Sequence, residues 1–355
     1  MRHVRALMLG VALLALVVAC GGYALLSEIR AAAAESGEAV EIEVEEGSST
    51  AAIAATLASE GLIRQPALFV ALVRLQGLDG KLQAGRFTLS PTMTMSEIIV
   101  ELQTNRIVES QFTIPEGLRL EEIAAIIGRT GVIDEAEFLA ATRNGDAFRD
   151  RYFLLNDLPD GATLEGYLFP DTYRISATST TTDVVDLMLA RFVEQYGSIE
   201  REVQVPDVTV HQIVTMASVV QREAARFDEM PKISAVFWNR LKPENVAETG
   251  NGRLQADPTV QYALGYSADE ATWWRKNLTI TDLEIASPYN TRVNPGLPPG
   301  PIAAPGLAAL RAAARPDDTA NYLYFVANCA RDGSHNFAAT LAEFQQYEAE
   351  WLACQ

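Results

Sequence analysis

The strongest constraint on this chain is an uncharged apolar run near its N-terminus. The run covers residues 6–26, which is about the length that crosses the hydrocarbon core of a bilayer as a helix. Two arginines precede it and three glutamates follow it before residue 40, and positive charge marks the cytoplasmic end of a membrane helix. We therefore expect residues 1–30 to form a cytoplasmic tip and a single-pass anchor, with everything after Arg30 outside the cytoplasm.

The cysteines leave two alternatives open. The stretch VVAC that ends at Cys20 resembles a bacterial lipobox, in which Cys20 would carry a lipid after cleavage. We favour the uncleaved anchor because the apolar run continues to Leu26, which a lipoprotein would not need. In both cases the bulk of the chain lies outside the bacterial cytoplasmic membrane, where disulfides can form. Cys329 and Cys354 could then pair, or stay as two unpaired small hydrophobic residues.

The composition argues against several classes of protein. Hydrophobic residues make up 48% of the 355 positions, which is enough for real cores and argues against a disordered chain. The 46 acidic and 28 basic residues give a net charge of −18, so we expect no nucleic-acid partner, because affinity for phosphates depends on Lys and Arg. Three scattered histidines and three scattered cysteines exclude a structural zinc site. The chain also lacks the G-x-S-x-G and H-E-x-x-H motifs of proteases.

Changes of pattern divide the extracytoplasmic part of the chain into four segments. Residues 31–39 are small and polar and indicate a linker. Residues 40–107 begin with an alternating apolar and acidic strand and predict a small α+β module. Residues 108–160 are interpreted as connecting structure, and residues 161–355, with loops rich in Pro, Gly and Asn, as the larger mixed α+β domain. Periodicity predicts helices at 50–59, 66–76, 96–103, 120–128, 135–142 and 184–196, and strands at 40–44, 82–89 and 111–114.

One helix in the larger domain carries a carboxyl group on its apolar face. Thr209 can cap a helix that runs to about Phe227, and its apolar side chains step by three and four positions. Glu223 lies within this stripe, between Val220 and Phe227. Burial would raise its pKa and keep it protonated near neutral pH, as a general acid requires. The alternatives are a glutamate paired with a basic residue, or a stripe that ends at Val220.

Two later segments carry the side chains that bind sugars. Residues 253–260 read RLQADPTV, and residues 287–292 read SPYNTR. Amides and hydroxyls match sugar hydroxyls, while aromatic faces cover the apolar faces of sugar rings. Trp273 and Trp274 lie between the two segments and are either stacking platforms or ordinary packing residues.

The ordered set of motifs resembles the YceG-like family, whose best-known members are endolytic murein transglycosylases. The matching blocks, in chain order, are LEGYLFPDTYRI, ASVVQREA, VFWNRL, LQADPTV, SPYNTR, GLPPGPI, YLYFVA and SHNF. The resemblance covers about residues 5–350. It implies an α+β fold in which residues 40–107 form a LysM-like module and residues 161–355 form the catalytic transglycosylase domain.

The resemblance also implies roles for individual residues. Glu223 would be the catalytic acid, although many relatives carry a second Glu where this chain has Gln221. We hypothesise that Asn239 and Gln255 orient the sugar or the acid, with Tyr262 and Tyr289 as lesser candidates. The residues implied to line the substrate cleft are Asn239, Gln255, Asp257, Thr259, Tyr289 and Asn290.

The implied reaction needs one well-placed acid, no metal and no organic cofactor. Glu223 would protonate the oxygen between N-acetylmuramic acid and N-acetylglucosamine, and the C6 hydroxyl would then close onto C1 to give a 1,6-anhydro end. Asp257, or the more distant Glu165, would make the enzyme a hydrolase if it activated water. The family implies cleavage of nascent peptidoglycan strands at the cytoplasmic membrane, control of glycan chain length, and proximity to a synthesis complex with penicillin-binding proteins. The alternative is a non-catalytic, membrane-anchored peptidoglycan-binding scaffold.

Overall fold

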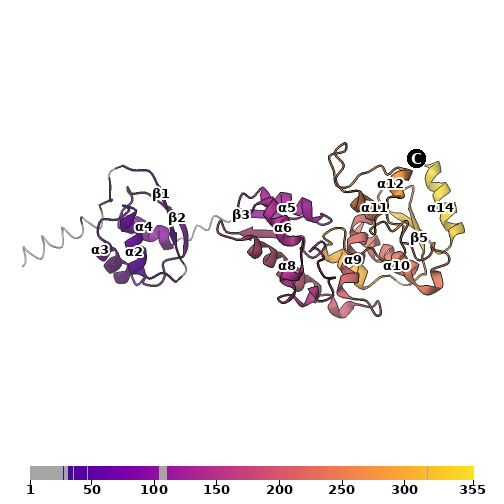
Figure 1. Cartoon of the computed structure of the whole chain (residues 1–355), viewed down its shortest axis with the longest axis horizontal. Coiled ribbons are helices and arrows are strands. Elements are labelled where there is room, and N and C mark those ends of the chain that lie inside the picture. Colours follow the sequence, from indigo (N-terminus) through magenta and orange to yellow (C-terminus); the bar gives the residue numbers. More distant parts are fainter. Residues whose placement is uncertain (1–26, 28–30, 35, 46, 104–109, 318) are drawn as a thin grey trace, which may run out of the picture. The chain divides into compact units, whose positions relative to one another are not determined.

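The chain folds into two compact units, each built from helices and small sheets. The computed structural model describes Ser27 and residues 31–34, 36–45, 47–103, 110–317 and 319–355. The first unit holds the residues up to 109 together with Ser176–Thr178, and the second holds Ser110–Ile175 and Ser179–Gln355. Within the described residues each of three sheets has two antiparallel strands, and helices make up most of the remaining regular structure (Figure 1). The predicted α+β class is therefore confirmed.

The first unit packs three helices against one sheet of two antiparallel strands. Strand β1 (Val40–Val44) pairs with β2 (Gly85–Leu89), so that Ile42 lies opposite Phe87 on the buried face. The Ser49 side chain accepts the Ala52 N–H and starts the first helix. The helices are α2 (Thr50–Ser59), α3 (Pro66–Leu75) and α4 (Met95–Gln103). All of these elements were predicted, with ends that differ by a few residues.

The segment predicted as a linker is partly tied to the first unit. The Ala34 N–H donates to the Pro91 carbonyl at 2.9 Å. The guanidinium of Arg64 donates twice to the Ala33 carbonyl, at 2.9 and 2.7 Å. The start of the predicted linker is therefore hydrogen-bonded to the first unit through Ala33 and Ala34. No helix among the described residues is long and apolar enough to cross a membrane, and the predicted span at residues 6–26 lies outside the described residues.

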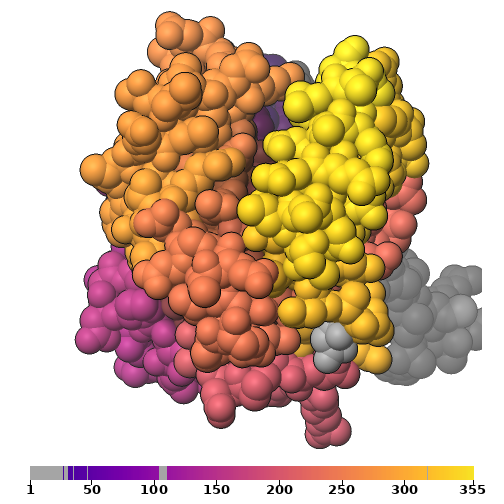
Figure 2. Space-filling model, turned by 90° about the vertical axis from the view of Figure 1, so that its right-hand side faces the viewer, coloured from indigo at the N-terminus to yellow at the C-terminus, as the bar shows by residue number. Residues whose placement is uncertain are grey.

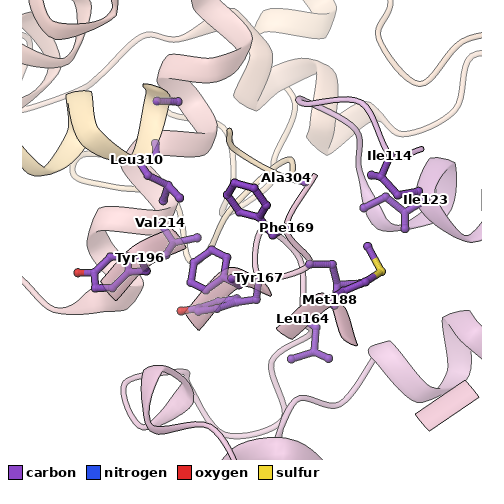
Figure 3. Close-up of a cluster of buried hydrophobic side chains, with 14 of the residues drawn as sticks. Ile114, Ile123, Leu164, Tyr167, Phe169, Met188, Tyr196, Val214, Ala304 and Leu310 are labelled. Carbon is purple, nitrogen blue, oxygen red and sulfur yellow. The ribbon is translucent and has the colours of Figure 1, made fainter. Parts of the chain in front are cut away.

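From Ser110 onward, the segment predicted as connecting structure (108–160) contributes to the core of the second unit. Strand β3 (Ser110–Thr113) pairs with β4 (Thr172–Ile175), and both contribute to one hydrophobic core with helix α9 (Val210–Glu223). Figure 3 shows part of this core, with Ile114 and Ile123 on one side of the view, Val214 and Leu310 on the other, and Phe169 between them. The boundary at residue 160 is therefore not a domain boundary, because apolar side chains on both sides of it are buried together. The helices here are α5 (Leu120–Gly128), α6 (Glu135–Thr142), α7 (Asp146–Arg149) and α8 (Thr181–Gly197).

The remainder of the second unit surrounds helix α9. Helix α13 packs against both α9 and α10, while α14 packs on the sheet of β5 and β6. The elements are α9 (Val210–Glu223), α10 (Met230–Leu241), α11 (Asp257–Leu264), α12 (Ile280–Leu283), α13 (Leu307–Ala314), β5 (Tyr324–Ala327), β6 (His335–Ala338) and α14 (Leu341–Ala353). Single 3-10 turns lie at Phe153–Leu155, Glu200–Glu202, Phe227–Glu229 and Pro243–Asn245.

A disulfide closes the C-terminal part of the second unit. Cys329, shortly after β5, is bonded to Cys354, just after the end of α14, with their Cα atoms 6.0 Å apart. Of the two alternatives for these cysteines, the structure therefore has the paired one. The bond fastens the far end of α14 to the loop between β5 and β6.

Candidate active site

Helix α9 ends at Glu223, four residues earlier than the sequence pattern predicts. The Thr209 side chain accepts the Gln212 N–H and starts the helix as predicted. At the other end Ala224 adopts an extended conformation, and Phe227 lies in a 3-10 turn with 67% of its surface exposed. The prediction that Phe227 continues the buried stripe is wrong. Glu223 instead stands at the last turn of α9, just beyond the buried Val219 and Val220.

The side chain of Glu223 opens into a cleft of about 490 Å³. Figure 2 shows this cleft as a hollow between the orange segment around α11 and α12 and the yellow C-terminal segment with α14. Among the residues named from the sequence, Glu223, Gln255 and Asp257 meet there. The complete lining is Glu223, Val236, Phe237, Arg240, Leu254, Gln255, Asp257, Arg292, Leu323, Tyr324, Phe325, Leu341, Phe344 and Glu348.

The surroundings of Glu223 keep its carboxyl group protonated near neutral pH. Burial is the main cause, and the negative charge of Asp257 adds to it, so that the pKa of Glu223 rises from 4.5 to about 7. The positive charges of Arg292 and Arg222, together with a hydrogen bond from the Asp257 backbone, oppose this rise in pKa without cancelling it. The result is a carboxyl group that can donate a proton at neutral pH and hold one again afterwards.

Asp257 is held in an ion pair across the cleft floor. Its Oδ1 accepts a hydrogen bond from Nε of Arg292 at 2.6 Å, and Nη2 of Arg292 lies 2.5 Å from the same oxygen. Two buried hydroxyls fix the backbone beneath this pair, because Thr259 Oγ1 lies 2.8 Å from Thr291 Oγ1 and donates to the Ala256 carbonyl. Thr259 therefore does not line the cleft, and it fastens the start of α11 to the segment that carries Arg292.

Gln255 is positioned by an arginine that the sequence reasoning did not single out. Its Oε1 accepts a hydrogen bond from Nη2 of Arg240 at 2.6 Å. Gln255 also has a positive φ of 59°, a conformation that costs free energy for a residue other than glycine and that needs support from its surroundings. Arg240 is 5% exposed and also donates to the Leu323 and Arg253 carbonyls, at 2.9 and 2.8 Å. Arg240 thus joins α10, β5 and the loop that carries Gln255.

The two predicted asparagines are structural and do not line the cleft. Asn239 is 3% exposed, and its Nδ2 donates to the Tyr322 carbonyl at 3.1 Å. Asn290 is fully buried, and its Nδ2 donates to the carbonyls of Leu283 and Ile285, at 3.0 Å each. Because backbone carbonyls already occupy these amide groups, neither side chain is free to orient a sugar.

The predicted tyrosines and tryptophans pack around two arginines outside the cleft. Tyr262 and Tyr289 have ring centroids 4.8 Å apart. The guanidinium of Arg119 lies 4.3 Å from the ring centroids of both Tyr262 and Trp273. Trp274 stacks in the same way, 3.7 Å from the guanidinium of Arg222. These cation–π contacts attach the α11–α12 segment to the rest of the unit, and ordinary packing is the interpretation that the structure supports for both tryptophans.

Glu165 is a second carboxyl group with a raised pKa, but it is sealed inside the protein. It is 2% exposed and does not line the cleft. Its Oε2 accepts hydrogen bonds from the Leu120 N–H at 3.2 Å and from the Tyr262 hydroxyl at 3.3 Å. Burial raises its pKa to about 8. Without access to the cleft, this carboxyl group cannot activate water at a bound sugar.

The departure from the family pattern at Gln221 has a structural explanation. Gln221 Oε1 accepts the Gly306 N–H at 3.0 Å, at the start of α13, and the side chain does not line the cleft. The side chain at position 221 therefore has a structural role at the start of α13. Glu223 is thereby the carboxyl group of this helix that faces the cleft.

The cleft combines a carboxyl group that can donate a proton with polar and aromatic walls. One wall offers amide, carboxylate and guanidinium groups, and the other offers the aromatic rings of Tyr324, Phe325 and Phe344. The sequence reasoning missed this aromatic wall as a set of site residues, although YLYFVA was among the matching blocks. Within the part of the chain that the structure describes, no group of three or more His, Cys, Asp or Glu side chains is placed to hold a metal ion.

Comparisons with known proteins agree with the matching motifs. The family model for the YceG-like family matches residues 42–350. A protein of Bacillus subtilis (strain 168) named endolytic murein transglycosylase is 34% identical over 335 residues, which cover 90% of this chain and 86% of that protein. A protein of the same name from Streptococcus pneumoniae serotype 2 is 30% identical over 350 residues, and the match covers 92% of this chain but 62% of that longer protein.

A solved structure shows the same fold. A crystal structure of a yceG-like protein from Listeria monocytogenes superposes with a TM-score of 0.56 and 31% sequence identity, covering 88% of this chain and 99% of that one. Because the family model and the relatives each span most of the chain, the resemblance found in the sequence is confirmed. The chain belongs to the YceG-like family.

Proposed function

We propose that this protein is an endolytic murein transglycosylase, as its bacterial relatives are named. It would cleave the bond between N-acetylmuramic acid and N-acetylglucosamine within a peptidoglycan strand and leave a 1,6-anhydro end. The observation that carries this proposal is a single carboxyl group, Glu223, with a pKa of about 7 in an open cleft. That group has the protonation state that glycosidic bond cleavage requires.

The reaction follows from one group acting twice. The protonated Glu223 gives its proton to the bridging oxygen, the bond from that oxygen to C1 breaks, and the N-acetylglucosamine leaves with a free C4 hydroxyl. The resulting carboxylate then takes the proton of the C6 hydroxyl as O6 bonds to C1. Because the nucleophile belongs to the substrate, the second step is intramolecular and needs no bound water.

The geometry of Asp257 favours this reaction over hydrolysis. Hydrolysis by inversion needs a second carboxylate that removes a proton from water. Both nitrogens of Arg292 that contact Asp257 lie against the same oxygen, Oδ1, with Nε donating a hydrogen bond at 2.6 Å and Nη2 2.5 Å away. This ion pair already occupies Asp257, whose charge also raises the pKa of Glu223, so Asp257 is better suited to these two roles than to the activation of water.

The location and the partners are part of the same proposal. The apolar run at residues 6–26 with its flanking charges supports a single-pass anchor in the cytoplasmic membrane, with the lipoprotein attached through Cys20 as the alternative. We also propose that the first unit is a LysM-like module. An anchored enzyme would act near the membrane on nascent strands, where the peptidoglycan synthesis complex and its penicillin-binding proteins work, and would set glycan chain length.

Product analysis tests the proposed reaction. The full chain is incubated with purified peptidoglycan, and the soluble fragments are analysed by mass spectrometry. Internal cleavage with 1,6-anhydro ends is the expected result. Reducing ends would show hydrolysis, and binding to sedimented peptidoglycan without release of fragments would show a non-catalytic scaffold. Either result contradicts the proposal.

A further inference from the structure

One face of the C-terminal helix forms a wall of the cleft. Leu341, Phe344 and Glu348 of α14 all line it. Their spacings of three and four residues place them on the same side of a helix. Leu341 is 52% exposed, and an apolar side chain that opens into a cleft can contact an apolar group of a ligand. The face therefore presents an aliphatic, an aromatic and an acidic group in a row.

Phe344 is paired with a second aromatic ring that also lines the cleft. The ring centroids of Phe344 and Tyr324 are 5.3 Å apart, and their planes are inclined by 31°. The Tyr324 hydroxyl donates to the Glu248 carbonyl at 3.1 Å, which fixes that ring. The guanidinium of Arg240 lies 5.5 Å from the centroid of the Tyr324 ring. The two rings thus form a supported aromatic surface, the type of surface that covers the apolar face of a sugar ring.

The helix α14 packs on β5 and β6 and is fixed in addition at both of its ends. None of its residues in Leu341–Ala353 is buried. Its first turn is capped by Thr340 and Glu343, which exchange hydrogen bonds with each other's backbone N–H groups. Its last turn is fixed by the Cys329–Cys354 disulfide, beside which Arg331 donates to the Cys354 carbonyl at 2.8 Å. The N-terminal cap and the disulfide together keep the cleft-facing side of α14 in place.

We propose that this wall is a binding subsite for an N-acetylated hexose of the glycan strand. Phe344 and Tyr324 would cover the sugar ring, Leu341 would contact the methyl group of the acetamido substituent, and the Glu348 carboxylate would accept its N–H. An acetamido group combines an apolar methyl with an N–H donor, whereas the hydroxyl at the same position of a plain hexose is a donor without the methyl. The inference rests on the proposed function and adds the part of the cleft that recognises the sugar.

A binding experiment separates this subsite from the chemistry. The full chain with Glu223→Gln, which cannot donate the catalytic proton, is titrated by calorimetry with chitotetraose and, separately, with cellotetraose, which lacks acetamido groups. We expect binding of chitotetraose only. Adding Phe344→Ala should weaken that binding by about tenfold, the equivalent of one lost stacking contact. Glu348→Ala removes the acceptor for the acetamido N–H and should weaken the binding of chitotetraose.

Two further variants control for the structure of the helix. Leu352→Ala removes an apolar side chain of α14 that is 61% exposed and does not line the cleft. This variant should change the affinity for chitotetraose by less than about twofold, compared with about tenfold for Phe344→Ala. Replacing both Cys329 and Cys354 by serine should weaken binding with the Glu223 pocket intact. Circular dichroism of each variant verifies that the protein is folded.

The outcomes distinguish the subsite from the proposed reaction. Equal affinity for both sugars, or an unchanged affinity in a folded Phe344→Ala protein, would overturn the subsite even if peptidoglycan digestion gives 1,6-anhydro ends. Conversely, tight chitotetraose binding that depends on Phe344 supports the subsite even if no anhydro ends form, a result that would overturn only the proposed reaction.

Discussion

Replacing Glu223 by glutamine should stabilise the second unit at pH 8 and leave its stability unchanged at pH 4. In the folded state the pKa of Glu223 is about 7, whereas the ordinary pKa of a glutamate side chain is 4.5. Each pKa unit corresponds to about 1.4 kcal/mol, so the ionised carboxylate costs the folded state about 3 kcal/mol. The stabilising effect of the proton is complete below pH 4.5 and is lost as the pH rises through 7. Glutamine stays neutral at every pH and avoids that cost.

Urea unfolding followed by tryptophan fluorescence measures this difference. All four tryptophans, from Trp238 to Trp351, belong to the second unit, so the signal is independent of the first unit. The measurement at pH 4 is the control, since both proteins then carry a neutral side chain of nearly the same shape. A variant that is less stable than the wild type at pH 8, or a difference that does not change with pH, would refute the assignment of a raised pKa.

Three further predictions follow from the same structure. The value of kcat/KM should fall tenfold per pH unit above about pH 7, where Glu223 loses its proton. Asp257→Asn should move this fall to lower pH, because the charge of Asp257 raises the pKa of Glu223, and an unchanged pH profile would contradict that cause. Replacing both Cys329 and Cys354 by serine should lower the free energy of unfolding of the second unit by about 3–4 kcal/mol, because the disulfide no longer closes the loop between them. Faster amide exchange in α14 is the measurement that checks this. Gly166→Ala should destabilise the second unit by about 3 kcal/mol in urea melts, because Gly166 has a φ of 82° and an added Cβ would lie 2.4 Å from Pro301; a wild-type midpoint would contradict this.

Local signals explain how well the individual helices could be predicted. Helices α5 and α6 have the predicted bounds because periodicity and capping agree there, with Glu122 accepting the Arg119 N–H and Asp134 accepting the Glu137 N–H. Helix α9 ends early although Ala224 and Ala225 favour helix and Phe227 continues the apolar spacing. The helix ends there because the chain has to reverse into α10, which is a tertiary requirement that no local pattern encodes.

Residues of the site could be predicted from the sequence only where the residue type has few structural roles. Glu223 was singled out because a carboxyl group on an apolar helix stripe needs an explanation, and Asp257 through the block LQADPTV; both line the cleft. The amides of Asn239 and Asn290 were misplaced, because an amide serves a buried carbonyl as well as a sugar hydroxyl. The wall formed by α14 escaped notice because it is more than 80 positions after Asp257 in the sequence, and only the packing on β5 and β6 and the disulfide bring it to the cleft.

The protonation state of Glu223 in the wild-type protein is the central claim, and it can be measured directly. Carbon-13 NMR of the full chain, labelled at the glutamate side-chain carboxyl carbons, follows each titration, and the signal that disappears in Glu223→Gln identifies Glu223. The account predicts a midpoint near pH 7 for that signal. A midpoint below pH 5 would mean that the group is ionised at neutral pH, and the cleft would then lack the acid on which the proposed reaction depends.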